Sequence, residues 1–162
     1  TGSGIIAVSL ARYLPGSKVT AVDISTRALD LAKRNAEALG VGERILFLQA
    51  DVFHWNPEEK YDLIVSNPPY ISAAEMRCLQ PEVRFEPYEA LFGGEKGLDF
   101  YFRLAELAAA SLKNQGVLAV EIGWQQADEV RGIFRKAGLC EIVTVRDYGD
   151  RDRVVLGQKR QG

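Results

Sequence analysis

Glycines at the start of the chain are spaced as in loops that bind a ligand through the backbone. The segment Gly2 to Ala7, GSGIIA, matches the pattern G-x-G-x-x-[GA] and opens an apolar stretch typical of a helix. Such a loop lets a ligand approach the backbone closely while the N–H groups at the helix start face it. An acid, Asp23, follows about 20 residues later, where nucleotide-binding folds hold ribose hydroxyls. Together these features favour a nucleoside-containing ligand, whereas the glycines alone also fit a tight turn.

A second segment, Asn67-Pro68-Pro69-Tyr70, has a specific chemical use. Two consecutive prolines exclude both helix and strand, so the segment is rigid. The Asn67 side-chain oxygen and the Pro68 carbonyl can each accept one N–H of a planar amide or amino group, and Tyr70 can pack on that group. The nitrogen lone pair then points at an electrophilic methyl group. This chemistry favours S-adenosylmethionine over a nicotinamide dinucleotide, although a rigid turn without function is the simpler alternative.

Alternating strands and helices must position these residues. Their predicted ranges are strands over 18–23, 44–49, 61–66, 116–122, 141–146 and 153–157, and helices over 5–14, 25–39, 98–113 and 125–137. This alternation indicates an α/β fold of Rossmann-like type, with a mostly parallel sheet and helices on both faces. In such folds ligands bind beyond the carboxyl ends of the strands, where Asp23, Asp51 and Asn67 fall. No periodicity predicts an element between residues 71 and 96.

Composition narrows the class of protein. The chain has 162 residues, 47% of them hydrophobic and 26% charged, which suits one soluble domain with a packed core. Its net charge of −2 gives no overall attraction for nucleic acid. Cys78 and Cys140 lie too far apart for a C-x-x-C site, and the single histidine, His54, cannot complete a metal cluster with them. We therefore expect a metal-free cytoplasmic protein with no membrane partner and no direct nucleic-acid partner.

Several short motifs resemble the class I S-adenosylmethionine-dependent methyltransferases in their order along the chain. These motifs are TGSG at 1–4, AVD at 21–23, LQAD at 48–51 and NPPY at 67–70. The motif NPPY narrows the resemblance to members that methylate planar nitrogens. Further motifs resemble the HemK/PrmC family, the protein-glutamine methyltransferases of peptide-chain release factors. They are VRFEP at 83–87, AL-x-GG at 90–94, EIG at 121–123 and DRDRV at 150–154.

By this resemblance, the substrate is the side-chain amide of the glutamine in the Gly-Gly-Gln motif of a release factor. The methyl donor is S-adenosyl-L-methionine, which leaves as S-adenosyl-L-homocysteine. The resemblance assigns residues to the cofactor and to the substrate as follows. Cofactor-binding residues are Thr1, Gly2, Ser3 and Gly4 in the loop, Asp23 and Ile24 at the ribose, Asp51 and Val52 at the adenine, and Asn67. Substrate-binding residues are Asn67, Pro68, Pro69 and Tyr70, of which Asn67, Pro68 and Tyr70 are catalytic.

The family also has parts that these 162 residues do not contain. Its members have a strand that leads into the glycine loop and a helical N-terminal domain that helps to bind the release factor. We therefore expect residues 1–162 to be an N-terminally truncated catalytic domain. Its sheet should lack the first strand and end on an antiparallel strand.

Two other functions stay open on the sequence alone. A methyltransferase for adenine or guanine amino groups in nucleic acid would use the same Asn-Pro-Pro-aromatic segment on a flipped-out base. The acidic net charge argues against it. A non-catalytic nucleotide-binding domain or an NAD-dependent Rossmann domain would leave the NPPY segment unexplained. We interpret His54 as a surface or packing residue rather than a base. Asp51 is expected at the adenine edge, and a cap of the turn that follows it is the alternative.

Overall fold

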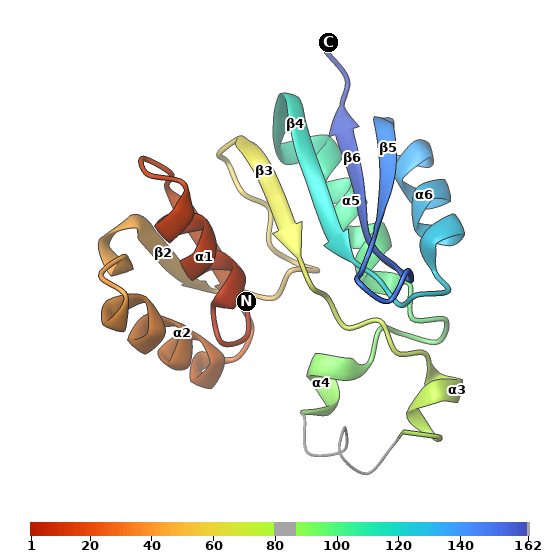
Figure 1. Cartoon of the computed structure of the whole chain (residues 1–162), viewed down its shortest axis with the longest axis horizontal. Coiled ribbons are helices and arrows are strands. Elements are labelled where there is room, and N and C mark those ends of the chain that lie inside the picture. Colours follow the sequence, from red (N-terminus) through yellow and green to blue (C-terminus); the bar gives the residue numbers. More distant parts are fainter. Residues whose placement is uncertain (80–86, 162) are drawn as a thin grey trace. The chain divides into compact units, whose positions relative to one another are not determined.

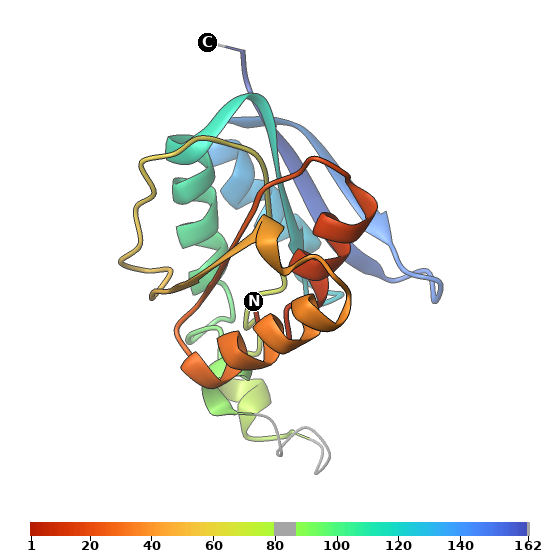
Figure 2. The ribbon, with the colours of Figure 1, turned by 90° about the vertical axis from the view of Figure 1, so that its left-hand side faces the viewer.

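The computed structural model describes residues 1–79 and 87–161 (Figure 1). Residues 83–86 of the VRFEP motif lie outside the described residues. The chain forms two compact units, Thr1–Asn56 and Pro57–Gly162, and Figure 2 shows both from a second side. Within the described ranges, no helix has the length and apolar character needed to cross a bilayer.

The first unit is a pair of parallel strands covered by two helices. Its elements are α1 (Ile5–Tyr13), β1 (Val19–Asp23), α2 (Thr26–Ala38), the 3₁₀ helix η1 (Gly42–Arg44) and β2 (Ile45–Gln49). Strands β1 and β2 pair in register from Val19 opposite Ile45 to Asp23 opposite Gln49. Alternate strand residues turn to the helices, as the period of a strand requires, and form one core with them. The members of this core are Ala7, Val8, Ala11, Val19, Ala21, Ala36, Val41, Ile45 and Phe47.

The second unit is a four-stranded sheet in the order β3-β4-β6-β5. Its elements are β3 (Tyr61–Ser66), α3 (Ala73–Met76), α4 (Tyr88–Leu91), α5 (Asp99–Ser111), β4 (Leu112–Glu121), α6 (Ala127–Lys136), β5 (Leu139–Arg146) and β6 (Asp152–Lys159). Strand β3 runs parallel to β4, and β6 runs antiparallel to both β4 and β5. Helix α5 packs on β4, and α6 packs on β5, β6 and α5. The expected α/β class and the antiparallel last strand are confirmed.

The predicted elements all exist, most with ends shifted by one or two residues. Strand β4 begins at Leu112 rather than at residue 116, because Leu112 pairs with Tyr61 across an irregularity in the ladder. Strand β6 continues to Lys159, where it still pairs with Leu139 of β5. The stretch without predicted elements contains the one-turn helices α3 and α4, which are too short to show a helical period.

Helix α3 nevertheless has a sequence signal. The Ser72 hydroxyl accepts a hydrogen bond from the Glu75 backbone N–H at 3.3 Å, and the Glu75 carboxylate accepts one from the Ser72 N–H at 2.9 Å. This reciprocal pair is a capping box, which the spacing S-x-x-E encodes. The helix therefore starts where the sequence allows its free N–H groups to be satisfied.

Close packing of α1 on α2 depends on Gly4. Its φ is +80°, a left-handed conformation, and a Cβ placed on it would lie 2.7 Å from the Cβ of Ala32 in α2. Gly16 has a similar φ of +90°, yet no atom lies within 4 Å of the position of its Cβ. The two glycines thus share the backbone requirement and differ in the space around them.

We expect Gly4→Ala to lower the free energy of unfolding by roughly 2 to 5 kcal/mol, the sum of left-handed strain and overpacking. Gly16→Ala should cost only about 1 to 2 kcal/mol, because strain acts there alone. Urea unfolding of both variants measures the difference. Equal losses would show that α1 and α2 can move apart at no cost.

Candidate functional site

The glycine loop leaves backbone accessible at the start of α1. Gly2 is exposed, has a φ of +56°, and has no atom within 4 Å of the position of its Cβ. The Gly4 N–H donates to the Thr1 carbonyl at 3.0 Å, and the Gly4 carbonyl accepts the Val8 N–H at 2.8 Å. Gly4 therefore serves helix packing, whereas Gly2 and the exposed Ser3 present backbone that a ligand can approach.

Asp23 fixes this loop to the end of β1. One carboxylate oxygen accepts the Gly2 N–H at 2.8 Å and lies 2.9 Å from the Thr1 backbone nitrogen. The other oxygen accepts the Ser25 N–H at 2.9 Å. A carboxylate has about four acceptor positions, so one remains for a ribose hydroxyl. Burial acts to raise the pKa of Asp23, but these donors outweigh it and hold the pKa below the ordinary value of 3.8.

Ile24 lies next to Asp23 and is 60% exposed, which offers an apolar surface beside the carboxylate. The Ala50 N–H donates to the Asp23 carbonyl at 3.0 Å, so the chain leaving β2 runs beside the end of β1. Asp51 and the partly buried Val52 follow directly. The first unit thus gathers the predicted cofactor-binding residues at the carboxyl ends of its two strands, except Asn67, which belongs to the second unit.

Asp51 caps the turn after β2. Its carboxylate accepts the Phe53 N–H at 2.9 Å and lies 3.0 Å from Nδ1 of His54. The interpretation of Asp51 as a turn cap is confirmed, and its contact with adenine stays a prediction. The His54 side chain is 84% exposed, which confirms its interpretation as a surface residue.

The segment Asn67–Tyr70 leaves the sheet at the carboxyl end of β3, where Ser66 pairs with Val120 of β4. Pro68 is buried, whereas Pro69 and Tyr70 are partly buried. Asn67 is exposed, and its side chain has no hydrogen-bond partner among the residues that the structure describes. Its amide oxygen is therefore available to a substrate.

The AL-x-GG motif packs on the NPPY segment and forms hydrogen bonds with Ile71, the residue that follows it. The Ile71 N–H donates to the Leu91 carbonyl, and the Gly93 N–H donates to the Ile71 carbonyl, both at 2.9 Å. A Cβ on Gly93 would lie 2.7 Å from the Pro69 carbonyl oxygen. A Cβ on Gly97 would overlap the Tyr70 carbonyl oxygen. These glycines are required because the backbone of the NPPY segment packs directly on them.

The EIG and DRDRV motifs stabilise the fold and do not form a separate site. Arg153 Nη2 lies 3.0 Å from the Asp147 carboxylate, and Arg153 Nη1 donates to the Ile122 carbonyl at 3.5 Å. The hydrogen bond to Asp147 raises the pKa of Arg153. These contacts tie the β5–β6 hairpin to the end of β4, where Gly123 follows.

Sequence reasoning missed two polar side chains near the NPPY segment. The Gln126 side chain donates to the Tyr70 carbonyl at 3.1 Å, and it lies 3.1 Å from the Tyr101 hydroxyl. Tyr101 is fully buried in α5, and burial raises its pKa. No motif singles out either residue, although EIG lies close to Gln126 in sequence.

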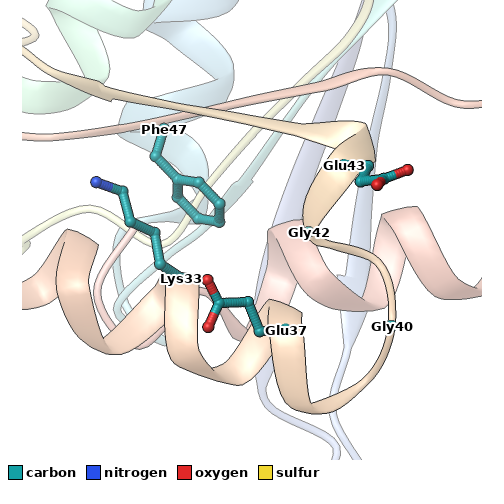
Figure 3. A pocket seen from close by; sticks show the side chains of 6 residues that line it. All are labelled: Lys33, Glu37, Gly40, Gly42, Glu43 and Phe47. Atoms are coloured by element: carbon teal, nitrogen blue, oxygen red, sulfur yellow. The ribbon is translucent and has the colours of Figure 1, made fainter.

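Two grooves of the first unit are formed mainly by residues other than the predicted site residues. A groove of about 610 Å³ between α2 and β2 is lined by Lys33, Glu37, Gly40, Gly42, Glu43 and Phe47, as Figure 3 shows. A smaller one of about 180 Å³ is lined by Ser3, Ile5, Val8, Asn35, Ala38 and Leu39. Within residues 1–79 and 87–161, no three His, Cys, Asp or Glu side chains are grouped to hold a metal ion.

The lowered pKa of Asp23 makes its contribution to stability depend on pH. A carboxyl group with a lower pKa in the folded state stabilises the fold above its unfolded pKa of about 3.9. This contribution is lost as the pH falls through the folded pKa. We therefore expect Asp23→Asn to be less stable than the parent between about pH 5 and 7, with the difference shrinking below about pH 4. Urea unfolding at each pH measures it, and a constant difference down to about pH 2 would contradict this role.

Comparison with known proteins bears on both units. The family model of the methyltransferase small domain matches residues 1–80. The release factor glutamine methyltransferase of Geobacter sulfurreducens is 46% identical over 158 residues, which cover 97% of this chain and 55% of that protein. The release factor glutamine methyltransferase of Escherichia coli is 40% identical over 161 residues, which cover 99% of this chain and 58% of that protein. The chain thus spans little more than half the length of these curated relatives.

Solved structures agree in fold. The crystal structure of a methyltransferase from Pyrococcus furiosus superposes with a TM-score of 0.74 at 20% identity, covering 99% of this chain and 72% of that one. TrmN from Thermus thermophilus superposes with a TM-score of 0.65 at 26% identity, covering 98% of this chain and 42% of that one. The fold is therefore the Rossmann-like fold of the class I methyltransferases. Over nearly its whole length, the chain is 40% to 46% identical to these two release factor glutamine methyltransferases.

Proposed function

We propose that residues 1–162 form the catalytic domain of a protein-glutamine N-methyltransferase that acts on the Gly-Gly-Gln motif of peptide-chain release factors. The observation that carries this proposal is the segment Asn67–Tyr70, a rigid backbone that presents an exposed amide side chain at a strand end, with no partner for that amide among the described residues. The identity to release factor glutamine methyltransferases supports the choice of substrate. Because the chain covers little more than half of these relatives, the activity of the whole protein is part of the proposal.

The residues of the first unit fit a nucleoside cofactor. Gly2 leaves open space at the loop, Asp23 retains an acceptor position, and Ile24 adds an apolar surface. We assign the ribose hydroxyls to Asp23, the adenine to Ile24, Asp51 and Val52, and the rest of the cofactor to the loop Thr1–Gly4 and to Asn67. When bound, S-adenosylmethionine supplies an electrophilic methyl group, which the amide nitrogen takes up as the carbon–sulfur bond breaks.

The residues of the NPPY segment act by positioning. An amide nitrogen is a weak nucleophile because its lone pair is delocalised into the carbonyl. In our proposal, the Asn67 side-chain oxygen accepts one N–H of the substrate glutamine and the Pro68 carbonyl accepts the other. Tyr70 packs on the planar amide, and Pro69 keeps the segment rigid. After transfer the nitrogen loses a proton to water, so the exposed His54 is not needed as a base.

The partner in this proposal is a release factor, whose Gly-Gly-Gln loop must reach Asn67. We place the reaction in the cytoplasm, since the two cysteines in the described residues, Cys78 and Cys140, are both free thiols. No direct contact with nucleic acid is required. An oligonucleotide with unpaired adenines tests the alternative in which the same segment holds a base.

Replacing Asn67 tests the mechanism. We expect Asn67→Ala to lower kcat on a release factor by about 10² or more, similar to the loss of one preorganised catalytic hydrogen bond. The affinity for S-adenosylmethionine should change less than about tenfold. Single-turnover transfer of a tritiated methyl group measures the chemical step.

The exposed Asn114 of β4 provides a matched control, and Asn114→Ala should retain the parent rate. Asn67→Asp keeps an acceptor but adds a negative charge near the sulfonium, so it separates geometry from charge. Full activity of Asn67→Ala would show that the NPPY segment is only a rigid turn without a catalytic role. If the parent methylated the oligonucleotide as fast as the release factor, nucleic acid rather than protein would be the substrate.

Replacing Asp23 tests the cofactor assignment. Asp23→Ala removes a charge-assisted hydrogen bond worth roughly 1.5 to 3 kcal/mol and should weaken S-adenosylmethionine binding about ten- to a hundredfold. Isothermal titration measures the affinity, with Asp30→Ala on the exposed side of α2 as a control that should bind like the parent. NAD should bind poorly to every variant. Tight NAD binding by the parent would overturn the assignment.

A further inference from the structure

Gln126 uses every hydrogen-bonding position of its side-chain amide at the end of β4. Its oxygen Oε1 accepts the Gly123 N–H at 3.0 Å and lies 3.1 Å from the Tyr101 hydroxyl. Its nitrogen Nε2 donates to the Tyr70 carbonyl at 3.1 Å and to the Gly97 carbonyl at 3.2 Å. A glutamine amide has two donor hydrogens and two acceptor lone pairs, so this set is complete.

This side chain does not serve its own helix. Gln126 occupies the N-cap position of α6, but its side chain makes no capping hydrogen bond there. Glutamine is also outside the group of residues preferred as N-caps. The side chain reaches instead to residues 29 and 56 positions away in the sequence, Gly97 and Tyr70.

Two neighbours determine which way the amide faces. The Gly123 N–H can only donate, so Oε1 must be on its side and Nε2 must face the two carbonyls. The Tyr101 hydroxyl is within 3.2 Å of the Glu121 carbonyl as well as near Gln126. Because burial raises its pKa, Tyr101 keeps its proton and remains a donor to this cluster.

The NPPY segment is therefore held at both of its ends. Before it, Ser66 pairs with Val120 in the parallel ladder. At its end, the Tyr70 carbonyl is held by Gln126. Between these points the two prolines fix their φ angles, so little freedom remains. Asn67 has no side-chain partner in the described residues and takes its position from this backbone alone.

We propose that Gln126 is a positioning residue for methyl transfer, which sets the orientation of Asn67 and of the Pro68 carbonyl by anchoring the Tyr70 carbonyl. The proposal rests on the proposed function, because the group being oriented is the substrate amide. A misplacement of about 1 Å at a reacting group can cost about a hundredfold in rate. Removal of the anchor should therefore affect the chemical step more than the binding of either substrate.

The test compares variants of two adjacent glutamines. Gln126→Leu removes all four hydrogen bonds at similar volume, and Gln125→Leu changes an exposed neighbour as the matched control. We expect Gln126→Leu to lower kcat on a release factor at least about tenfold, with KM for S-adenosylmethionine within about twofold of the parent. Gln125→Leu should keep both constants.

Gln126→Glu gives a signature that general loss of structure would not produce. An ionised carboxylate would face the Tyr70 and Gly97 carbonyls without a hydrogen to donate, whereas the protonated acid donates to one of them. We expect its kcat relative to the parent to rise several-fold as the pH falls from about 8 to about 6, because the burial of this group raises the pKa of a glutamic acid. The ratio for Gln126→Leu should not change with pH.

Hydrogen exchange separates this inference from the proposed function. In Gln126→Leu, peptides covering residues 70–77 should exchange faster than in the parent, while those covering Ala127–Lys136 should not. Unchanged exchange, or a kcat within twofold of an active parent, overturns the role of Gln126. A parent that does not methylate the release factor overturns the proposed function, and faster exchange in the variant would then still support the anchor.

Discussion

Parallel pairing of strands is the constraint on which the candidate site depends. Parallel neighbours run in the same direction, so their carboxyl ends meet at one edge and the chain segments that leave them lie together. In the first unit, Asp23 pairs with Gln49, and the segments after both strands are linked through the Ala50 N–H. In the second unit, Ser66 pairs with Val120, which brings the NPPY segment beside the turn that starts at Gly123.

A chain that leaves a sheet must find new partners for its backbone N–H and carbonyl groups, since the ladder no longer supplies them. In this protein, one polar side chain does so at each of three strand ends. Asp23 accepts the N–H groups of Gly2 and Ser25, Asp51 accepts that of Phe53, and Gln126 donates to the Tyr70 carbonyl after β3. The Asp23 and Asp51 carboxylates lie where only backbone N–H groups need a partner. The neutral Gln126 amide lies where both an N–H and carbonyl groups need one. These choices follow from which backbone groups each turn leaves unpaired.

Residues without reactive side chains set the geometry around Asn67. Two prolines limit the torsion angles that precede Tyr70, and Gly93 and Gly97 let the neighbouring segment pack against the NPPY backbone. Any side chain at these glycines would occupy the space of the Pro69 or Tyr70 backbone. Rigidity here comes from steric exclusion and from hydrogen bonds at the two ends, so Asn67 itself can stay exposed, with no side-chain partner in residues 1–79 and 87–161.

The sequence by itself determined the order of the elements, because strand and helix periods and turn residues are local properties. It also determined which ligands and reactions are possible, since the glycine loop, Asp23 and the NPPY segment are short motifs whose residue types fit only a few kinds of ligand. It did not indicate the one-turn helices α3 and α4 by period, as four residues are too few for one. The tertiary structure alone decided that Gln126 and Tyr101 support the NPPY segment. Apart from Gly123, their partners lie 20 to 56 residues away, and nothing local in a sequence records which distant carbonyl a side chain will meet.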